Sequence, residues 1–374
     1  MRILHVHSGN MYGGVEAMLA TLARRRDACP DMQQQFALCF EGRLSHELAG
    51  IGASTHFIGA VRVSWPLTVV RARHELRKLL SSRVFDALVF HSAWSQAIFG
   101  PVARAARIPA VLWMHGTTAG RHWTERWARR ANPDLVVCNS RFTACSAAAV
   151  YPKTARQVLY CPVELNSAQL SISERHLIRS ELNTPDHAVV IVQVSRMERW
   201  KGQLLHLEAL STLKSIPDWV CWFAGAPQRP EEERYFEEIR NAAVRLEIAE
   251  RVRFLNERSD VPRVLRAADI YCQPNLQPEP FGIALVEALS AALPVVTTSM
   301  GGAKEIVDAT CGMLVCPGDA AEVAGALRRL IEDAHLRRGL GKGGPARARE
   351  LSDPTARIKE LSGILNRVVS LSHN

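Results

Sequence analysis

The stretch Glu279-Pro280-Phe281-Gly282-Ile283-Ala284-Leu285-Val286-Glu287 follows the apolar run Ile270 to Gln273 and opens a segment rich in Ala and Leu. A short apolar run bounded by turn residues is typical of a buried strand, and the segment after it is typical of a helix. Gly282 at the helix entry would leave the N–H groups of Phe281 to Ala284 facing a ligand, because the first amides of a helix have no carbonyl partner within it. The stretch therefore predicts the strand, loop and helix order of an open α/β domain.

The two glutamates of this stretch are eight residues apart, a spacing that chance alone can produce in a chain of this length. On a helix they would lie about two turns apart, so both carboxylates could face one cleft from different depths. The Pro-Phe-Gly insert behind Glu279 is more informative, since Pro and Gly each make up only about 5 to 7% of average proteins. Alternatively, Glu279 only stabilises the helix N-terminus against the helix dipole.

The same alternation of apolar runs and helical patterns extends over the whole chain. In the first half the strand-like runs are Ile3 to His7, Phe36 to Phe40, Ala87 to His91, Ala110 to Met114 and Leu135 to Cys138. In the second half they are Val189 to Val194, Val220 to Ala224, Val252 to Leu255, Ile270 to Gln273, Val295 to Thr298 and Met313 to Val315. Continuous apolar strands separated by helices predict two α/β domains, each built on a parallel sheet covered on both faces.

The expected domains are residues 1–165 and 166–350, followed by a C-terminal helix at 351–374. The seam is placed where Pro162 and the polar stretch Asn166-Ser167-Ala168-Gln169 interrupt the pattern. A short helix rich in Ala and Arg is expected at Val102 to Ala106. The last helix is expected after Gly339 to Pro345 and begins at Pro354. Its apolar side would carry Ile358, Leu361, Leu365 and Val368.

Composition is that of a globular protein with two domains. A length of 374 residues is about twice that of an average domain, and no apolar run approaches the roughly 20 residues of a membrane span. Nine cysteines at irregular spacing favour reduced thiols in the cytoplasm over a disulfide framework. No Cys-x-x-Cys pair indicates a metal site. A cytoplasmic protein is therefore expected.

The excess of positive over negative charge is confined to the first half of the chain. Residues 1–160 hold 20 Lys and Arg against 9 Asp and Glu, whereas the remaining residues hold 26 against 28. The basic stretches near Trp65, Trp123 and Trp127 are solvated helix faces or, alternatively, contacts to an anionic membrane surface or a phosphate-bearing acceptor. A nucleic acid is not expected as a partner, because no recognised binding motif accompanies the charge.

Two further motifs follow strands at positions where α/β domains bind ligands. Gly13-Gly14-Val15-Glu16 comes between the first strand and the first helix, where paired glycines would let the backbone approach an anion, or would simply form a turn and helix cap. In the loop Ser195 to Gly202, Arg196 and Lys201 could clamp a diphosphate, or could be exposed loop cations.

Taken together, these motifs resemble the retaining glycosyltransferases of family 4. The stretch from Glu279 to Glu287 is similar to their E-x7-E signature. Similar in place and order are Gly13 to Glu16, His115-Gly116, Asn139 to Thr143, the loop with Arg196 and Lys201, Asp260 to Asp269, and Gly301 to Val307. Asn275, where the family usually has a small residue, departs from the pattern. The resemblance implies the GT-B architecture, in which two Rossmann-like domains face each other across a cleft and the C-terminal helix returns to the N-terminal domain.

The resemblance also implies a role for each matching residue. Arg196 and Lys201 would hold the donor diphosphate, and Glu287 would bind the ribose hydroxyls. Glu279 would hold the sugar hydroxyls, assisted by the backbone of Phe281, Gly282, Ile283 and Ala284. His115 would contact the sugar, with Gly13 and Gly14 near the phosphates. From the residues alone, core histidines remain the alternative for His115 and His91.

The implied activity is retaining transfer of a hexosyl unit from a UDP- or GDP-sugar to a glycan or a lipid-linked saccharide. No Asp-x-Asp motif is present to hold a divalent ion, so cations of the protein are expected to stabilise the leaving diphosphate without a metal or cofactor. A nucleotide-sugar epimerase and a non-catalytic glycan-binding protein remain as alternatives. A dinucleotide-dependent oxidoreductase would need Gly-x-Gly-x-x-Gly after a strand, which Gly13-Gly14 does not supply.

Overall fold

The computed structural model describes residues 1–165 and 170–372, and the chain forms two compact units. Unit 1 consists of Met1–Val163 and Ser352–Asn374, and unit 2 consists of Glu164–Leu351. The polar stretch 166–169, where the seam was expected, lies outside the described residues. A boundary between residues 165 and 166 therefore stays a prediction.

The sheet of unit 1 has seven parallel strands in the order β3-β2-β1-β4-β5-β6-β7. These strands are β1 (Arg2–His7), β2 (Gln33–Leu38), β3 (Thr55–Phe57), β4 (Ala87–Phe90), β5 (Ala110–Met114), β6 (Leu135–Cys138) and β7 (Arg156–Val158). The strand order reverses between β1 and β4. In open α/β sheets, ligands bind at the carboxyl ends of the strands at such a reversal.

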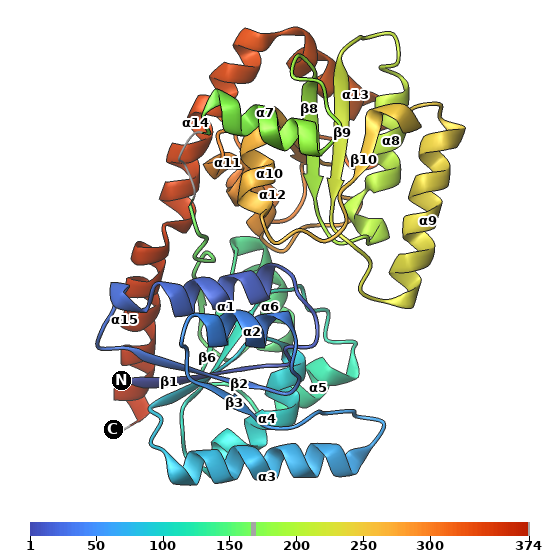
Figure 1. Ribbon diagram of the computed structural model, residues 1–374. Coiled ribbons are helices and arrows are strands. Elements are labelled where there is room, and N and C mark those ends of the chain that lie inside the picture. The colour runs from blue at the N-terminus through green and yellow to red at the C-terminus, as the bar shows by residue number, and fades with distance from the viewer. Residues whose placement is uncertain (166–169, 373–374) are drawn as a thin grey trace. The chain divides into compact units, whose positions relative to one another are not determined.

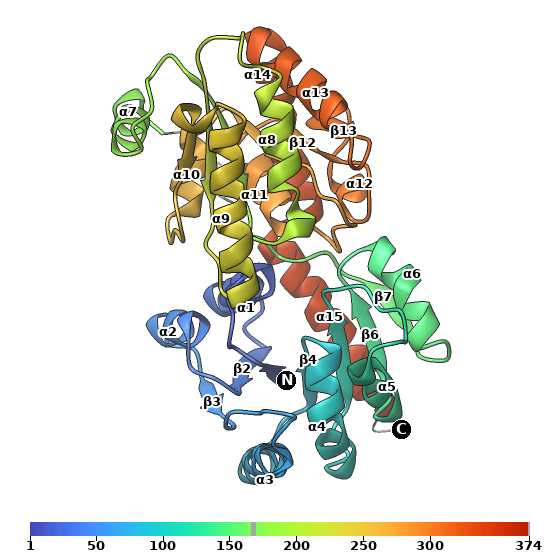
Figure 2. The same cartoon turned by 90° about the vertical axis from the view of Figure 1, so that its right-hand side faces the viewer.

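Helices cover both faces of this sheet, as the apolar strands require. They are α1 (Gly14–Arg24), α2 (Arg43–Gly50), α3 (Pro66–Ser82), α4 (Ala93–Ala105), α5 (Trp123–Arg130), α6 (Arg141–Val150) and α15 (Pro354–Ser372). Figure 1 shows α1 and α3 on opposite faces of the sheet. The helix α15 (Figure 2) contacts α1. On its predicted apolar side, Ile358, Leu361 and Leu365 are fully buried.

The sheet of unit 2 has six parallel strands in the order β10-β9-β8-β11-β12-β13. Its strands are β8 (Val189–Val194), β9 (Trp219–Ala224), β10 (Val252–Phe254), β11 (Ile270–Gln273), β12 (Val295–Thr298) and β13 (Gly312–Val315). The order reverses between β8 and β11, the two strands that precede the loop of Arg196 and the loop of Glu279. Two loops about 80 residues apart in sequence are thus brought to one edge of the sheet.

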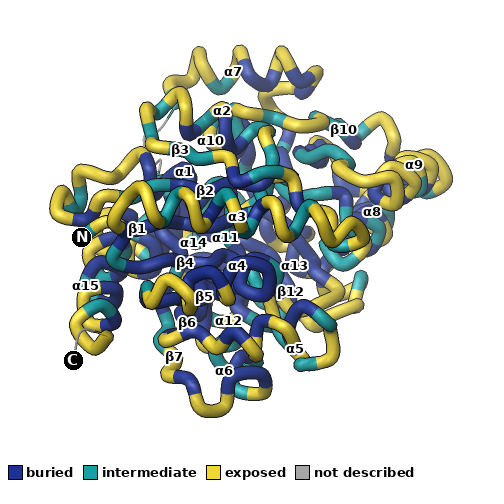
Figure 3. The backbone as a smooth tube through the Cα atoms, turned by 90° about the horizontal axis from the view of Figure 1, so that it is seen from below, coloured by how far each residue is buried: buried dark blue, intermediate teal, exposed yellow. Residues whose placement is uncertain are grey.

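The helices of unit 2 lie on both faces of its sheet. They are α7 (Ile172–Glu181), α8 (Gln203–Ser211), α9 (Pro230–Arg245), α10 (Val261–Ala267), α11 (Ile283–Ser290), α12 (Ala303–Ile306), α13 (Ala320–Glu332) and α14 (Ala334–Ser352). Figure 3 shows buried strands and exposed outer helix faces, and α9 is among the most exposed helices. The predicted α/β class, with two Rossmann-like domains, is confirmed.

Two helices differ from the sequence expectation. The helix α4 begins at Ala93 and not at Val102, and it contains Pro101 in its interior. The helix α14 runs through the whole Gly339 to Pro345 stretch, after which the sequence pattern predicts the last helix. A Cβ atom at Gly343 would lie 2.1 Å from the carbonyl oxygen of Thr310. Glycine at this position thus lets the helix approach a neighbouring backbone.

Within the described part of the chain, no helix combines the length and the apolar character needed to cross a membrane.

Candidate functional site

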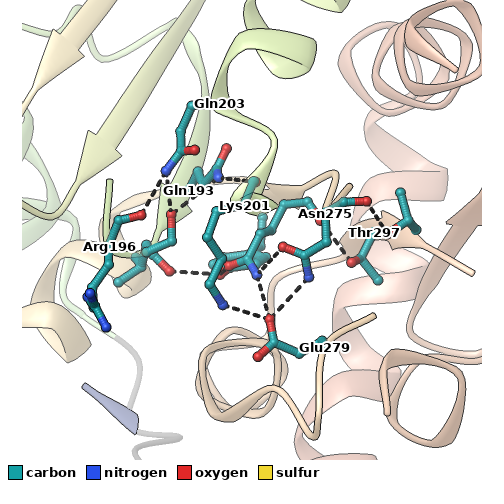
Figure 4. A network of polar contacts seen from close by, with 12 residues as sticks. Gln193, Arg196, Lys201, Gln203, Asn275, Glu279 and Thr297 are labelled. Atoms are coloured by element: carbon teal, nitrogen blue, oxygen red, sulfur yellow. Dashed lines mark hydrogen bonds and ion pairs between the residues drawn. The ribbon is translucent and has the colours of Figure 1, made fainter. Parts of the chain in front are cut away.

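Lys201 and Glu279, both predicted site residues, form an ion pair in unit 2. Nζ of Lys201 lies 2.7 Å from Oε2 of Glu279, and both side chains are nearly buried. The same oxygen accepts hydrogen bonds from Nδ2 of Asn275 at 3.1 Å and from Nε2 of Gln273 at 3.2 Å. Figure 4 shows the three donors converging on this carboxylate. The described residues offer no partner to the other oxygen, Oε1, so a ligand hydroxyl could bind there.

The loop that carries Lys201 is fixed against the loop before Glu279. Gly202 has a φ of +73°, and a Cβ there would lie 1.9 Å from the carbonyl oxygen of Pro274. The amide of Leu276 donates to the carbonyl of Trp200 at 2.7 Å. Nε2 of Gln193 also donates to the carbonyl of Lys201 at 2.9 Å. These contacts hold Lys201 in place before any ligand is bound.

Arg196 does not pair with Glu279 and forms ion pairs with two other carboxylates. Its NH2 group forms ion pairs with Glu232 and, at 3.2 Å, with Glu198. Its Nε is buried and has no hydrogen-bond partner in the part of the chain that the structure describes. A buried donor without an acceptor costs about 1 to 3 kcal/mol, so a bound anion would satisfy a group that the protein leaves unpaired. In Figure 4 the guanidinium points away from Glu279.

The predicted backbone site lies at the start of α11. Gly282 caps this helix with a φ of +115°, and a Cβ there would meet Leu285 at 2.8 Å. Phe281 is buried, whereas Ile283 and Ala284 are partly exposed. The amides of Ile283 and Ala284 belong to the first helical turn, where the helix itself supplies no acceptor. The amide of Gly302 donates to the carbonyl of Glu279 at 2.7 Å, so the Gly301-Gly302 pair supports this loop.

Glu287, which lies within α11, has a carboxyl group whose pKa is shifted. Glu287 is partly exposed, yet desolvation by the surrounding protein raises the pKa of its carboxyl group to about 7. The buried phenol of Tyr271 has a pKa raised well above 10, first by burial and then by repulsion from Glu279 and Glu287. Both glutamates therefore lie within electrostatic reach of one side chain on β11.

In unit 1, the predicted glycines lie at the start of α1. Gly13 caps this helix with an extended backbone, and a Cβ there would make only an ordinary contact of 3.6 Å with Glu16. Gly14 is the first helical residue and is exposed. Oε1 of Glu16 accepts a hydrogen bond from Nε2 of His7 at 2.7 Å. The fold does not itself require glycine at position 13, and the proposed closeness to phosphates stays a prediction.

His115 follows β5 and belongs to a row of side chains that the sequence analysis did not find. Its Nε2 lies 3.0 Å from Nδ1 of His91, and Nε2 of His91 lies 2.9 Å from Nδ1 of His5. Nε2 of His5 lies 3.1 Å from Oε1 of Gln34. His91 and His5 are buried, as the alternative of a core histidine predicts for His91. His91 is hydrogen-bonded to His115, and His5 is hydrogen-bonded to His91. Side chains alternate between the two faces of a sheet along each strand, and this alternation is the sequence signal that could have placed these histidines on one face.

No group of three or more His, Cys, Asp or Glu side chains in residues 1–165 and 170–372 is arranged to hold a metal ion.

Two family models match the chain. One is described as glycosyl transferases group 1 and covers residues 174–347; the other is described as Glycosyltransferase Family 4 and covers residues 12–167. The chain belongs to the family 4 glycosyltransferases. The group 1 match falls in unit 2, which holds Lys201 and Glu279, and the other match falls almost entirely in unit 1.

Curated relatives of this family 4 chain match over part of their length. A D-inositol 3-phosphate glycosyltransferase of Corynebacterium efficiens is 32% identical over 46% of this chain and 42% of the relative. A phosphatidyl-myo-inositol mannosyltransferase of Mycobacterium leprae is 40% identical over 24% of this chain and 25% of the relative. The match thus spans less than half the length of these two relatives.

A solved structure matches the family 4 chain over nearly its full length. HepE of Anabaena, crystallised in complex with UDP, gives a TM-score of 0.86 at 24% identity, covering 98% of this chain and 100% of HepE. Likeness at this identity shows the fold, which is GT-B as expected.

Proposed function

We propose that the chain is a retaining, metal-independent glycosyltransferase that moves a hexosyl unit from a UDP- or GDP-sugar to a glycan or a lipid-linked saccharide. The observation that carries this proposal is the pairing of Lys201 with Glu279 beside the start of α11. A fixed cation, a carboxylate with one oxygen available and a helix N-terminus are the groups that a sugar diphosphate needs. The UDP complex of HepE and the names of the curated relatives support the same reading.

In this proposal, charge stabilisation at the leaving diphosphate is the central task of the protein. The bond between the anomeric carbon and the diphosphate oxygen breaks, and a bond to the acceptor oxygen forms on the same face of the sugar. The acceptor proton passes to the departing phosphate. Lys201 and the unpaired Nε of Arg196 would stabilise the negative charge that develops on the diphosphate. Glu279 would orient the sugar hydroxyls, and Glu287 would bind the ribose. No step uses a metal, so a chelator should leave the rate unchanged.

The test of this assignment is the loss of either cation. Removing one fixed donor to a developing charge costs about 2.7 to 4 kcal/mol of transition-state stabilisation. Lys201→Ala and Arg196→Ala should each lower kcat at least about a hundredfold with the proper donor and acceptor. Arg199→Ala is the matched control, because Arg199 lies in the same loop, is exposed and pairs with Glu238. Near-normal turnover of either variant would reject the assignment.

The alternatives give different outcomes in simple assays. Thermal shifts with UDP-, GDP- and ADP-sugars would first identify the donor, because a ligand of the native state raises the midpoint. Conversion of that donor without any acceptor would favour an epimerase. Tight glycan binding with no turnover of any donor would favour a non-catalytic glycan-binding protein.

We also propose that unit 1 binds an anionic membrane surface through α3 and the turn before it. Trp65, Leu67 and Val70 are 65, 83 and 60% exposed, and Arg71 and Arg77 lie on the exposed side of the same helix. Apolar side chains flanked by cations suit a headgroup interface.

Vesicle sedimentation tests the membrane proposal. Binding to phosphatidylglycerol vesicles should weaken as salt rises and should fall about tenfold or more in Leu67→Ser, because an exposed leucine contributes roughly 1.5 kcal/mol or more on burial. Ile172→Ser is the control, since Ile172 is 90% exposed on α7 in unit 2. A wild-type protein that stays in solution at low salt would sink the proposal.

A further inference from the structure

Four adjacent strands of unit 1 align one side chain each in an unbroken row. We call Gln34, His5, His91 and His115 the histidine row. They come from β2, from β1 and from the ends of β4 and β5, which are neighbours in the sheet. Gln34 pairs in register with Ile3, and Val6 pairs with Phe90. Each step to the next strand therefore moves two residues toward the carboxyl edge, which keeps all four side chains on one face.

The hydrogen bonds of this row have a single direction. Nε2 of Gln34 donates to the carbonyl of Leu22 at 3.4 Å, so Oε1 is the atom that faces His5. A carbonyl oxygen can only accept, and Nε2 of His5 must therefore carry the hydrogen. The reverse orientation would place the amide oxygen of Gln34 against the carbonyl oxygen of Leu22.

Each neutral imidazole passes this direction to the next one. With hydrogen on Nε2, His5 has a bare Nδ1, which accepts from Nε2 of His91 at 2.9 Å. Nδ1 of His91 is then bare as well and accepts from Nε2 of His115 at 3.0 Å. Burial supports the neutral forms: it lowers the pKa of His5 to about 4, that of His91 well below 6.5, and that of His115 to about 3. Repulsion from neighbouring histidines lowers the last two further.

The row ends on an acceptor without a partner. Because Nε2 of His115 carries the hydrogen and donates to His91, Nδ1 of His115 carries only a lone pair. The described residues supply no hydrogen-bond donor to this Nδ1. His115 is partly exposed, unlike His5 and His91. We propose that Gln34, His5 and His91 are positioning residues that hold His115 in its Nε2–H tautomer, so that Nδ1 accepts a hydrogen bond from a hydroxyl of the bound sugar. The ligand in this statement rests on the proposed transferase function; the tautomer does not.

The first experiment reads the tautomers without any ligand. Long-range ¹H–¹⁵N spectra of the full chain labelled with ¹⁵N-histidine separate protonated from bare ring nitrogens, and single His→Gln variants assign them. We expect hydrogen on Nε2 in His5, His91 and His115. An Nδ1–H tautomer of His115 in the wild type would overturn the proposal, whatever the variants do.

Variants of Gln34 then test the direction. Gln34→Met removes the acceptor while keeping the length of the side chain, and His115 should become a mixture of tautomers. Gln34→Glu keeps an acceptor toward His5 and should retain the Nε2–H form. Gln35→Met is the matched control, because Gln35 accepts from His56 at 2.8 Å outside the row. An unchanged His115 tautomer in a folded Gln34→Met protein would refute the relay.

The ligand arm uses UDP-glucose and GDP-mannose against UDP and GDP alone. The ¹⁵N signal of His115 Nδ1 should move with a sugar nucleotide and not with the bare nucleotide. Gln34→Met should raise the KM for the donor roughly 5- to 20-fold, a range expected for one hydrogen bond to a sugar hydroxyl, and Gln34→Glu should restore it. An Nδ1 signal that no sugar nucleotide moves would refute the ligand part. Absence of transfer in the wild type would remove the proposed function and leave the tautomer result intact.

Discussion

At the scale of single residues, the two glutamates of the 279–287 stretch differ in how the protein treats their charge. Glu279 receives Lys201, Asn275 and Gln273 on one oxygen. For Glu287 the dominant influence is desolvation, which raises its pKa to about 7. An ionised carboxylate without such donors is costly to bury, so this position carries a stability cost that only a ligand or a proton relieves.

Glu287→Gln should therefore stabilise the protein in a pH-dependent way. The ordinary pKa of 4.5 applies to the unfolded chain, and the folded value is about 7. The folded state holds an extra proton between these values, so wild-type stability falls as pH rises through that window and stays lower above it. At pH 8 the variant should gain about 1 to 3 kcal/mol over the wild type, and at pH 4 about nothing.

Urea unfolding followed by hydrogen exchange in α11 would measure this difference. Glu208→Gln, on the exposed side of α8, is the control for the loss of one carboxylate. A constant difference between Glu287→Gln and wild type from pH 4 to pH 8 would contradict the explanation.

Some residues of the candidate site carry a signal in the sequence, and others do not. Arg196, Lys201 and Glu279 stand in loops after strands, which local patterns reveal. Glu232 could not be predicted as the partner of Arg196, because it lies on α9 and meets the loop only through the fold. Asn275 was noted as a departure from the family pattern, and the structure explains it as a hydrogen-bond donor to Glu279.

At the scale of elements, the strands with apolar runs were predictable, including the short edge strand β10, whereas the edge strands β3 and β7 of unit 1 were not. The strands β3 and β7 have three residues each, none of them buried, so they lack the apolar run that marks a strand. Pro101 concealed the first half of α4, since proline normally interrupts a helix. In α14, glycines that look like breakers are helical because the helix packs against backbone carbonyls.

Two glycine substitutions, one in the loop of Lys201 and one in α13, test whether the loop requires glycine for its backbone conformation and close packing. Gly202→Ala would place a Cβ 1.9 Å from the carbonyl oxygen of Pro274 at a φ of +73°. It should cost at least about 2 kcal/mol of unfolding free energy. Gly325→Ala, in an open position on α13, should instead be neutral or gain up to about 1 kcal/mol. Equal effects of the two substitutions in urea titrations would speak against this reading of the loop.

At the scale of the whole molecule, two units are assembled from a chain that leaves unit 1 after Val163 and re-enters it at Ser352. Two parallel sheets covered by helices on both faces were predicted from the alternating strand and helix patterns, whereas the order of the strands within each sheet comes from the structure. The return of α15 was expected from family resemblance, since an amphipathic pattern alone does not say which surface it covers. Its packing on α1 makes the stability of unit 1 depend on residues at the far end of the sequence.

Leu361→Ala should expose that dependence. Leu361 is fully buried on α15, and truncating such a leucine costs about 2 to 5 kcal/mol. Hydrogen exchange should accelerate in β1 and α1, while β8 and β11 in unit 2 should keep their protection. Leu371→Ala, 76% exposed on the same helix, is the control. Equal loss of protection in both units would contradict this assignment.

The chain leaves unit 1 after Val163 and returns to it at Ser352, and these two residues are hydrogen-bonded: the amide of Val163 donates to the carbonyl of Ser352 at 3.1 Å. A recombination event with a single crossover would therefore exchange only part of unit 1 between relatives. Exchanging the whole of unit 2 with that of a relative needs two crossovers, one near each end of this hydrogen bond. Chimaeras designed with both junctions there would keep α15 with the sheet that it completes.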